Sequence, residues 1–478
     1  MNLRVNLNDM KYRYGIYQIL NTYYNLWNIT FEEENYDIKI NIEDNFILIE
    51  DEEGKHIYDL KKDIEDITYN QWVKKTVFLY LKNKTHKTLP WGTLVGIRPS
   101  KIALDLINKN YNDKDIKRYF YNHYVAKEDK AKLCVDIANI ENKIVNKEKD
   151  KISVYIDMPF CPTRCLYCSF TSNPISKCKK LVEPYLEALY YEMNKLSQYI
   201  KNKNLKIQCV YFGGGTPTSI NNEQFHRTMK KIYENFIDNN NVEEFTVECG
   251  RPDSITESKL RSMKKYNVTR ISINPQSMNE DTLKRIGRTH SPKDIQNIFN
   301  MARNLGFDNI NMDLIVGLPG EGLDHIKRTC KEIKRINPDN ITVHGMSIKR
   351  GSRLFERILN NEEFKVPSQE ELNSMYAETI KLSKDLNMKP YYMYRQKNML
   401  GNMENIGYTK EGKIGLYNIQ MIEERQTIIA LGADAVSKII FLEENRIERC
   451  PNVKDVIEYT KRVEEMIERK VTLLNTLY

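Results

Sequence analysis

The sequence contains no long hydrophobic run. No apolar segment approaches the roughly 20 residues that a helix needs to cross a bilayer, and residues 1–6 have neither the apolar core nor the small-residue exit of a secretory signal. Hydrophobic residues make up 41% and charged residues 29% of the chain, and the mean hydropathy is −0.60, which argues against both a membrane protein and a disordered one. We therefore expect no membrane span and a cytoplasmic location.

Cysteine is scarce. Nine cysteines in 478 residues without a secretory segment do not make a disulfide framework. The sequence also lacks the nucleophile elbow on which Ser-His-Asp hydrolases depend and any repeat at the period of a solenoid. The length instead allows two or three domains with sizeable hydrophobic cores.

Charge of one sign does not accumulate. The 73 Lys and Arg residues and the 65 Asp and Glu residues give a net charge of +8, and runs of charge such as residues 147–151 are short. An excess of this kind usually covers solvated faces, although it can also attract anionic ligands. We expect no nucleic-acid partner, and an acidic small molecule is compatible with the charge.

Three cysteines stand close together after a strand-like run at 152–157. Cys161, Cys165 and Cys168 have the spacing CxxxCxxC, and no fourth cysteine lies close behind them. Three thiolates on one short loop can hold a soft metal centre and leave one coordination position open. This spacing favours a three-cysteine iron–sulfur cluster with an open position for chemistry.

A structural zinc loop is the alternative for these cysteines. Structural zinc normally has four closed ligands, arranged as two paired half-sites. The nearest further candidates, Cys178, Cys209 and His226, lack that partner spacing. We therefore prefer the iron–sulfur interpretation.

Residues 1–150 resemble a separate α+β domain. Strand-like patterns and helical patterns both occur in it: strands at 3–7, 37–42, 46–50 and 56–60, and helices near 62–82, 113–125 and 127–148. The segment 89–99 is rich in helix-breaking residues and contains Trp91 and Arg98, which is typical of a docking loop. We expect both side chains to pack against the following domain.

From residue 151 to about 350, apolar strands alternate with amphipathic helices. The expected strands are 152–157, 207–212, 243–248, 269–274, 309–315 and 340–344. The expected helices lie near 179–200, 221–237, 256–266, 292–305 and 322–336. This alternation predicts parallel strands joined by right-handed crossovers, and six such strands suggest a full or partial barrel.

Polar residues follow the ends of these strands. Residues 213–217 (GGGTP) follow the second strand, Glu248 ends the third, Asn274 and Gln276 end the fourth, and Asp313 lies in the fifth. Reactive groups gather at the carboxyl ends of parallel strands. The sequence therefore predicts one site that these residues share with the cysteine loop.

The glycines and the buried polar residues each have a structural alternative. Residues 213–217 either form a tight turn or hold the amino and carboxylate groups of a bound amino acid. Glu248, Gln276, Arg288 and Asp313 lie in or just after apolar strands, where burial costs several kcal/mol without a partner. They either pair with one another or contact a polar ligand, and we favour the ligand for the set.

Residues 351–478 lose the strand and helix alternation. They contain a long helix near 368–387, an aromatic and cationic stretch at 391–397, a strand-like run at 436–442 and a terminal helix from 452. In the aromatic stretch, Tyr392, Tyr394 and Arg395 could clamp a planar molecule that carries a carboxylate. Their alternative role is to cover the mouth of the barrel.

Taken together, these motifs resemble the radical S-adenosylmethionine (SAM) enzymes. The cysteine loop with Phe170 two positions behind it, residues 155–160 and 213–217, Gln276 and the run DLIVGLP at 313–319 resemble the oxygen-independent coproporphyrinogen III oxidase group. The sequence RPD after Gly250, YRQKN at 394–398 and ALGA at 430–433 narrow this to HemZ-type coproporphyrinogen dehydrogenases. The likeness covers about 150–440 firmly and reaches the N-terminal domain through 89–99.

The resemblance implies a fold and two cofactors. It implies an α/β fold with a partial (β/α)6 barrel at 151–350, an N-terminal α+β accessory domain at 1–150 and a substrate-covering α+β region at 351–478. A [4Fe–4S] cluster would be held by Cys161, Cys165 and Cys168, with SAM on its unique iron, and Tyr155 joins the catalytic set. The implied SAM contacts, some of them to a second SAM, are Tyr155, Tyr167, Gly214, Gly215, Thr216, Glu248, Gln276, Arg288 and Asp313.

The resemblance also implies a reaction and partners. One electron would cleave SAM to methionine and a 5′-deoxyadenosyl radical, which takes a hydrogen from a propionate β-carbon of coproporphyrinogen III. Loss of CO2 and one electron would then leave a vinyl group. The partners would be this tetrapyrrole and an electron donor such as flavodoxin or ferredoxin.

Two positions depart from the pattern of the decarboxylating oxidases. Those enzymes have a further cysteine where this chain has Phe170, and a histidine where it has Asp157. Phe170 resembles instead the haem chaperone branch of the family, so a haem-binding protein without decarboxylase activity is the alternative function. Radical chemistry on RNA is a weaker third hypothesis, suggested by the net charge of +8.

Overall fold

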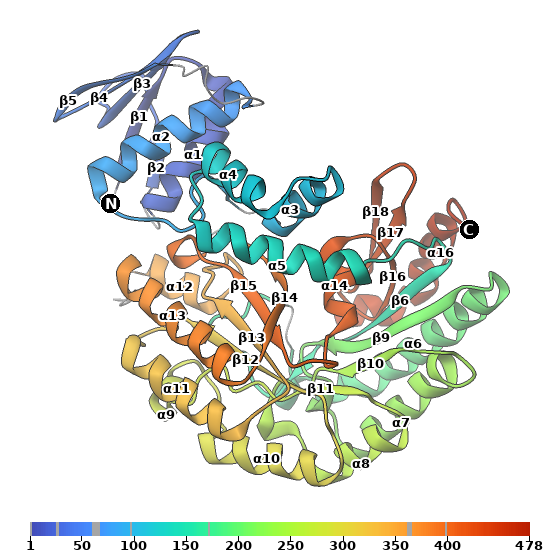
Figure 1. The fold of residues 1–478 in the computed structure, drawn as a ribbon. Helices are drawn as coiled ribbons and strands as arrows, with labels where there is room; N and C mark the ends of the chain where they lie inside the picture. The colour runs from blue at the N-terminus through green and yellow to red at the C-terminus, as the bar shows by residue number, and fades with distance from the viewer. Residues whose placement is uncertain are drawn as a thin grey trace.

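Two β-sheets organise the protein. The computed structural model describes residues 2–24, 28–59, 67–95, 98–170, 173–360, 366–396 and 399–478. Within these residues a five-stranded sheet lies near the N-terminus, and an 11-stranded sheet carries most of the remaining chain (Figure 1). Parts of four expected features lie outside the described residues, namely residue 60 and the segments 62–66, 96–97 and 397–398. Among the described residues, we find no helix with the length and apolar character required to traverse a membrane.

The small sheet has the strand order β2-β1-β3-β4-β5. Its strands are β1 (Asn2–Leu7), β2 (Asn28–Phe31), β3 (Ile38–Ile42), β4 (Phe46–Asp51) and β5 (Gly54–Asp59). Alternate residues are buried along β3 and β4 because helices α1 (Arg13–Tyr23) and α2 (Tyr69–Thr85) share a separate hydrophobic core with this sheet. The sequence predicted β1, β3, β4, β5 and α2, but not α1 or β2.

Three helices connect the small sheet to the large one. They are α3 (Pro99–Asn108), α4 (Asp113–Tyr124) and α5 (Glu128–Ile144). Their apolar side chains belong to the hydrophobic core of the large sheet, and α5 packs against strand β14 (Lys389–Tyr394). The sequence predicted α4 and α5, but α3 was missed.

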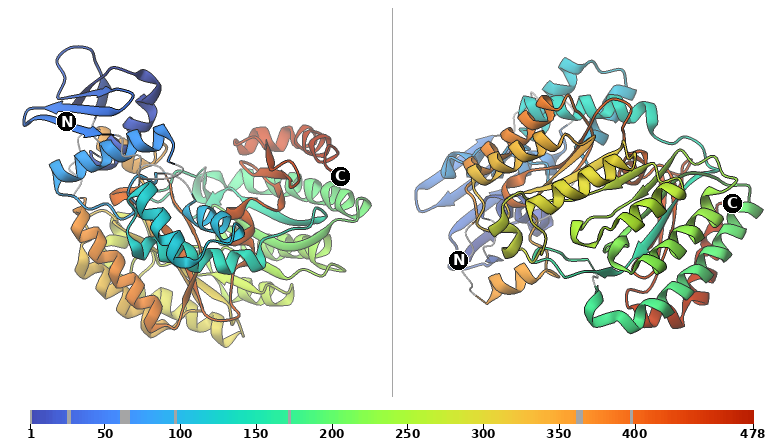
Figure 2. Two further views of the ribbon diagram at one scale, coloured as in Figure 1. Left: turned by 45° about the horizontal axis from the view of Figure 1, so that its top comes forward. Right: turned by 90° about the horizontal axis from the view of Figure 1, so that it is seen from below.

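Six parallel strands form the centre of the large sheet, as predicted. They are β6 (Lys151–Met158), β9 (Lys206–Gly214), β10 (Glu244–Val247), β11 (Arg270–Ser272), β12 (Ile310–Val316) and β13 (Asn340–Gly345). The connecting helices are α6 (Ile175–Asn202), α7 (Asn222–Ile232), α8 (Glu257–Lys265), α9 (Glu280–Arg285), α10 (Pro292–Asn304) and α11 (Leu323–Ile336). These helices cover the outer face of a curved sheet (Figure 2), so the prediction of an α/β partial barrel is confirmed.

The sheet continues beyond residue 350 at both of its ends. Beyond β13 lie β15 (Asn405–Thr409) and β14, which are antiparallel to their neighbours. On the other side, β16 (Thr427–Leu431) runs parallel to β6, and β17 (Val436–Phe441) and β18 (Arg446–Pro451) follow as antiparallel strands. The remaining C-terminal helices are α12 (Arg353–Leu359), α13 (Gln369–Asp385), α14 (Leu416–Glu423), α15 (Val456–Lys461) and α16 (Val463–Leu474).

Helix α14 lies across the inside of the curved sheet. It contacts both β14 and β9, which belong to different parts of the sheet (Figure 1). The carboxylate of Glu244, at the start of β10, accepts hydrogen bonds from the backbone N–H groups of Leu416 and Tyr417 at 2.6 and 3.3 Å. An acidic side chain at this end complements the helix dipole, so Glu244 fixes the start of α14 near the amino-terminal end of the barrel.

Candidate active site

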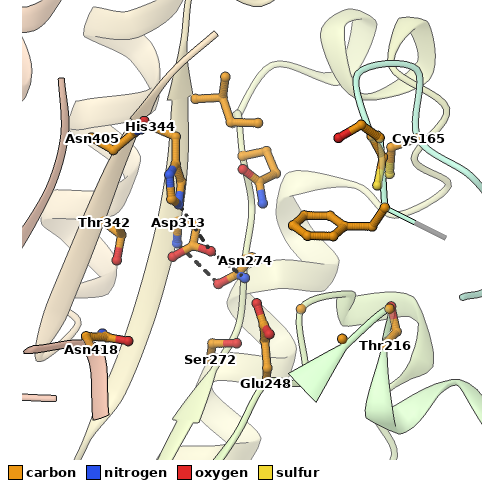
Figure 3. Close-up of a pocket in the computed structure, with 18 of the residues that line it drawn as sticks. Cys165, Thr216, Glu248, Ser272, Asn274, Asp313, Thr342, His344, Asn405 and Asn418 are labelled. Carbon is orange, nitrogen blue, oxygen red and sulfur yellow. Dashed lines mark hydrogen bonds and ion pairs between the residues drawn. The ribbon is translucent and has the colours of Figure 1, made fainter. Parts of the chain in front are cut away.

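A cavity of about 570 Å³ lies inside the curve of the large sheet. The residues that the family resemblance implied for the cluster and SAM all line it: Tyr155, Cys161, Cys165, Tyr167, Cys168, Gly214, Gly215, Thr216, Glu248, Gln276, Arg288 and Asp313. Figure 3 shows Cys165 and Thr216 on one side of this cavity and Asp313 and His344 on the other. The structure therefore brings together the cysteine loop, the glycine turn and the polar strand ends.

A short strand pair closes the cysteine loop. Strand β7 (Phe160–Cys161) pairs with β8 (Asn173–Pro174), and within the loop the backbone N–H of Cys168 donates to the carbonyl of Cys165 at 3.2 Å. No cysteine among the described residues is in a disulfide. The loop thus holds three free thiols at the edge of the cavity.

Hydrogen-bond donors face two of the three sulfurs. Arg251 Nη1 lies 3.6 Å from Cys165 Sγ, and Thr216 Oγ1 lies 3.5 Å from Cys161 Sγ. Burial raises the pKa of the Cys161 thiol to about 12, so this thiol keeps its proton until a metal takes the proton's place. The donors then stabilise the resulting thiolate.

The glycine turn leaves room directly beside the cysteine loop. Gly214 has φ +98°, and a Cβ there would lie 2.3 Å from Asp157 Oδ1. A Cβ on Gly215 would lie 2.9 Å from Cys161 Sγ, a distance that real Cβ atoms do not tolerate. Only glycine therefore permits both the turn and the close approach of backbone to the cysteine loop.

Asp157 lies behind this turn and is absent from the cavity lining. Its carboxyl accepts a hydrogen bond from Tyr155 Oη at 3.0 Å. Burial raises its pKa well above the usual value for an aspartate, which favours the neutral form, and its position behind the turn gives it a structural role. Of the two departures from the oxidase pattern, only Phe170 changes the cavity lining.

Asp313 is held by polar neighbours on three strands or strand ends. Its Oδ2 accepts from Asn274 Nδ2 at 2.8 Å, and its Oδ1 accepts from Asn311 Nδ2 at 2.7 Å. His344 Nε2 lies 3.7 Å from Oδ2 (Figure 3). Burial alone would raise the pKa of Asp313, but His344 and Asn311 hold it below its usual value. Asp313 is therefore an anion with internal partners, as one of the sequence alternatives allowed.

Glu248 behaves differently from Asp313. Burial, and next the negative charge of Asp313, raise the pKa of Glu248 to about 7. A carboxyl with such a pKa can donate or accept a proton near neutral pH. Glu248 and Asp313 are thus a pair of carboxyls with different charge states facing one cavity.

Arg288 and Gln276 leave polar atoms unpaired. The sequence pattern predicts Arg288 in or just after a strand, which is wrong: Arg288 lies in the loop between α9 and α10. Its Nη1 donates to the carbonyl of Asn274 at 2.6 Å and its Nη2 to Tyr167 Oη at 3.4 Å. Arg288 Nε and Gln276 Oε1 are buried without a hydrogen-bond partner among the described residues, as expected of groups that await a polar ligand.

Arg395 does not face the cavity, so its expected role as a carboxylate clamp is wrong. Its Nε donates to the carbonyl of Met403 at 3.1 Å and its Nη2 to that of Asn402 at 3.2 Å, while the guanidinium lies 5.2 Å from the ring of Trp91. Backbone carbonyls therefore use the N–H groups that a ligand would need. Tyr392 and Tyr394 do line the cavity.

Trp91 and Arg98 hold the N-terminal part of the chain in place, but their partners are not in the following domain, 151–350, as expected. Trp91 Nε1 donates to Glu404 Oε2 at 2.7 Å, and Arg98 Nη2 to Glu424 Oε2 at 2.9 Å. Both acceptors follow residue 350, so the segment that contains Trp91 and Arg98 docks on the C-terminal part of the chain.

Sequence reasoning missed several residues that line the cavity. Thr342 and His344 share a face of β13, and Arg270 and Ser272 share a face of β11, two residues before Asn274. A period of two along the predicted strands would have found them. Asn405, Tyr417 and Asn418 also line the cavity, but they come from C-terminal elements that the sequence pattern did not reveal.

The residues present suit an iron–sulfur cluster and an amino-acid ligand better than zinc. Among the described residues, no group of three or more His, Cys, Asp and Glu side chains is arranged to hold a single metal ion. The three sulfurs are therefore not arranged around one point, as a single zinc ion would require. A four-iron cluster is larger, and each thiolate would bind a different iron atom. The close glycine backbone and the unpaired atoms of Gln276 and Arg288 fit a ligand with amino and carboxylate groups.

Residues 155–333 match the Radical SAM superfamily. The oxygen-independent coproporphyrinogen-III oxidase-like protein HemZ of Bacillus subtilis (strain 168) is 38% identical over 413 residues, which are 85% of this chain and 82% of that protein. This chain belongs to the HemZ family of radical SAM proteins. Membership of the superfamily implies a [4Fe–4S] cluster and SAM.

Two further comparisons bear on the HemZ-family chain. The haem chaperone HemW of Bacillus subtilis (strain 168) is 33% identical over 224 residues, 47% of this chain and 58% of HemW. The coproporphyrinogen III oxidase HemN of Escherichia coli, a radical SAM enzyme, has a similar structure with a TM-score of 0.53 and 21% identity, covering 69% of this chain and 73% of HemN. The likeness to HemN supports the fold of this HemZ-family protein.

Proposed function

We propose that this HemZ-family protein catalyses the oxygen-independent oxidative decarboxylation of coproporphyrinogen III to protoporphyrinogen IX. The observation that carries the proposal is the convergence of three free cysteines, a glycine turn and unpaired polar groups on one cavity. In this proposal Cys161, Cys165 and Cys168 hold the cluster. When bound, the cluster and SAM supply a radical that removes a hydrogen atom from substrate.

The chain's own residues bind and orient the reactants in this proposal. Arg288 and Gln276 offer an unpaired donor and an unpaired acceptor to the carboxylate and amino groups of SAM, and the peptide groups of residues 214–216 contact its methionyl end. Tyr155, Tyr211 and Tyr417 form an aromatic stack that excludes water, with the rings of Tyr211 and Tyr417 4.4 Å apart. Glu248 holds or releases a proton at its carboxyl near pH 7.

An electron donor such as flavodoxin or ferredoxin completes the proposed reaction. Phe170, two residues from Cys168, is 65% exposed, so the cysteine loop approaches the surface where such a protein can dock. We further propose that the protein works in the cytoplasm under anaerobic conditions. The free cysteines among the described residues suit a reducing compartment.

A haem chaperone without decarboxylase activity is the second candidate. Phe170 lines the cavity where the oxidases have a further cysteine, and the similarity to HemW over 47% of the chain also favours this function. Both candidates share the proposed cluster site and bind a tetrapyrrole.

One anaerobic experiment tests the proposal. The reconstituted full chain is incubated with reductant, SAM and coproporphyrinogen III, and we expect 5′-deoxyadenosine, CO2 and a product with new vinyl groups, identified by mass. Cys168→Ala should abolish all three products, whereas Cys330→Ala, a change outside the cavity, should not. Formation of 5′-deoxyadenosine without loss of the porphyrinogen contradicts the decarboxylase. Stoichiometric transfer of haem to an apoprotein would then support the chaperone, and failure to bind haem would remove it.

A further inference from the structure

The cavity contains a buried arginine that no proposed SAM contact explains. Arg270, at the start of β11, lines the cavity with only 2% of its surface exposed. Its Nε and Nη2 atoms are buried and have no hydrogen-bond partner among the described residues. A guanidinium stays charged in proteins, and an unpaired buried charge is strongly destabilising. Arg270 is therefore incomplete without an anion.

The nearest carboxylate does not supply that anion. Glu244 contributes to the electrostatic environment of Arg270, but its two oxygens accept hydrogen bonds from Leu416 N and Tyr417 N, and Oε1 also accepts from Thr246. In the part of the chain that the structure describes, no Asp or Glu oxygen lies within the 4.0 Å of an ion pair with Arg270. Glu244 is thus committed to the start of α14.

Three phenols also lie near Arg270. The phenols of Tyr211, Tyr391 and Tyr392 lie near its guanidinium, and burial raises the pKa of each of them. Gly415 approaches so closely that a Cβ there would lie 3.3 Å from Arg270 Cζ. The cavity carboxyls Asp313 and Glu248 act on Arg270 through their charge, but neither occupies its Nε or Nη2, which have no hydrogen-bond partner among the described residues.

Arg270 lies at the opposite end of the cavity from the cluster loop. Arg270 starts β11 at its amino-terminal end, whereas the cysteine loop follows the carboxyl end of the parallel strand β6, and Arg270, Ser272, Asn274 and Gln276 all line the cavity. Figure 3 shows Ser272 below Asn274 on one wall, with Asn418 across the cavity. Ser272 Oγ is also buried without a partner among the described residues. The unpaired groups of Arg270 and Ser272 therefore mark a second subsite, on β11.

We propose that Arg270 and Ser272 form a carboxylate-binding subsite on the floor of the cavity, which takes a propionate arm of the tetrapyrrole. This inference rests on the proposed function for the identity of the tetrapyrrole. The planar fork of Arg270 fits both oxygens of a carboxylate, and Ser272 adds one donor. The stacked rings of Tyr211 and Tyr417, which line the cavity, provide an apolar wall for the methylene groups of the arm. Coproporphyrinogen and haem both carry propionates, so the subsite serves either candidate function.

Binding of two stable probes tests the subsite. The reconstituted full chain is titrated with coproporphyrin III, an oxidised tetracarboxylate, and separately with glutarate, a small dicarboxylate without a ring system. Arg270→Met should weaken the binding of both probes at least tenfold, and Arg270→Lys should weaken it less because the charge remains without the fork. Arg261→Met removes the same charge from the exposed face of α8, where Arg261 pairs with Glu257, and should change neither affinity. Equal binding by the wild type and a folded Arg270→Met overturns the subsite.

Ser272→Ala provides a second test if Arg270→Met does not fold. It should weaken the binding of both probes several-fold, and the absorbance of its reconstituted cluster checks that the variant is folded. Unchanged affinities in this variant would also overturn the subsite. Haem, which has two propionates, is the third ligand in the titration, and dependence of its affinity on Arg270 supports the subsite within the chaperone function.

The subsite and the proposed function fail in different ways. If the wild type forms no vinyl product but binds carboxylates in an Arg270-dependent manner, the decarboxylase is wrong and the subsite stands. If Arg270→Met binds the probes normally and converts coproporphyrinogen III at the wild-type rate, the subsite is wrong and the decarboxylase stands.

Discussion

Trp91 donates a hydrogen bond from its indole Nε1 to Glu404 Oε2 at 2.7 Å, although 313 positions of the chain separate the two residues. The other oxygen of Glu404 accepts from Lys130 Nζ at 2.6 Å. Glu404 is 1% exposed and Lys130 5% exposed. One carboxylate therefore joins the segment before α3, helix α5 and the segment before β15.

Glu404→Ala should destabilise the protein strongly, because it leaves the ammonium of Lys130 buried without a partner. Breaking a buried pair in this way costs about 3–5 kcal/mol, and we expect that loss in the free energy of unfolding from urea titration. Glu128→Ala, on the same helix as Lys130 but with a side chain that is 80% exposed, is the matched control and should change stability little. A loss below about 1 kcal/mol for Glu404→Ala would place this contact among ordinary surface pairs.

Replacing any one of Cys161, Cys165 and Cys168 with alanine should abolish the brown iron–sulfur absorbance. A cluster that leaves one iron open has only three protein thiolates, so the loss of one removes a third of its attachment. The measurement is absorbance together with iron content after anaerobic reconstitution. The controls Cys178→Ala, Cys209→Ala and Cys330→Ala affect cysteines outside the cavity lining and should keep the cluster. Retention of full absorbance by Cys165→Ala would refute the assignment.

The central strands and the position of the site were predictable because each depends on a local pattern. Strands β6, β9 and β12 have apolar runs flanked by clear turns, and the rule that reactive groups follow parallel strands placed Glu248 and Asp313 correctly in one cavity. The three residues of β11 were also found, since the expected strand overlapped them.

The remaining parts depend on contacts between distant segments. Strand β16 pairs with β6 across more than 250 positions, and no local pattern reports such a partner. Arg395 was expected to bind a ligand because its neighbours in the sequence are aromatic. The carbonyls that it contacts belong to Asn402 and Met403, and no sequence pattern predicted the turn that holds them. Arg288 reaches the cavity from a loop, where neither the period of two nor the helical period applies.

The division of the chain near residues 150 and 350 stays a prediction. Two observations bear on where its boundaries should be sought. The separate N-terminal core ends at Leu89, and helices α3 to α5 pack into the core of the large sheet. Strands β14 to β18 continue that sheet beyond residue 350.

Gly214→Ala should impair SAM binding more than cluster assembly. The new Cβ would lie 2.3 Å from Asp157 Oδ1 at φ +98°, so the turn that faces the proposed methionyl end must shift. Equilibrium dialysis with SAM should show an affinity loss of about tenfold or more, while the absorbance of the cluster is retained. Gly412→Ala is the matched control, because Gly412 also has a positive φ of +72° but no atom within 4 Å of the added Cβ. An equal loss of SAM affinity in both variants, relative to the wild type, would show that backbone strain and not the glycine turn at the site causes the loss.

Two buried carboxyls, Glu141 on α5 and Glu423 on α14, should make stability depend on pH. Glu141 is fully buried, and neither of its oxygens has a hydrogen-bond partner among the described residues. Burial, and next the nearby Glu423, raise the pKa of Glu141 to about 9. From about pH 5 upward the unfolded chain therefore releases a proton that the folded chain keeps.

This difference in bound protons fixes the sign of the effect. Because the folded state binds the extra proton, the free energy of unfolding should fall as pH rises, by about 1.4 kcal/mol per pH unit for one group. Between pH 5 and pH 8 the contribution of Glu141 amounts to about 4 kcal/mol. Glu141→Gln keeps the shape of the side chain but cannot ionise, so the variant should lose this part of the slope and be more stable than the wild type at pH 8. Urea titrations at both pH values measure it, with Glu128→Gln as the exposed control on the same helix, and identical slopes for Glu141→Gln and the wild type would contradict a protonated Glu141 in the folded state.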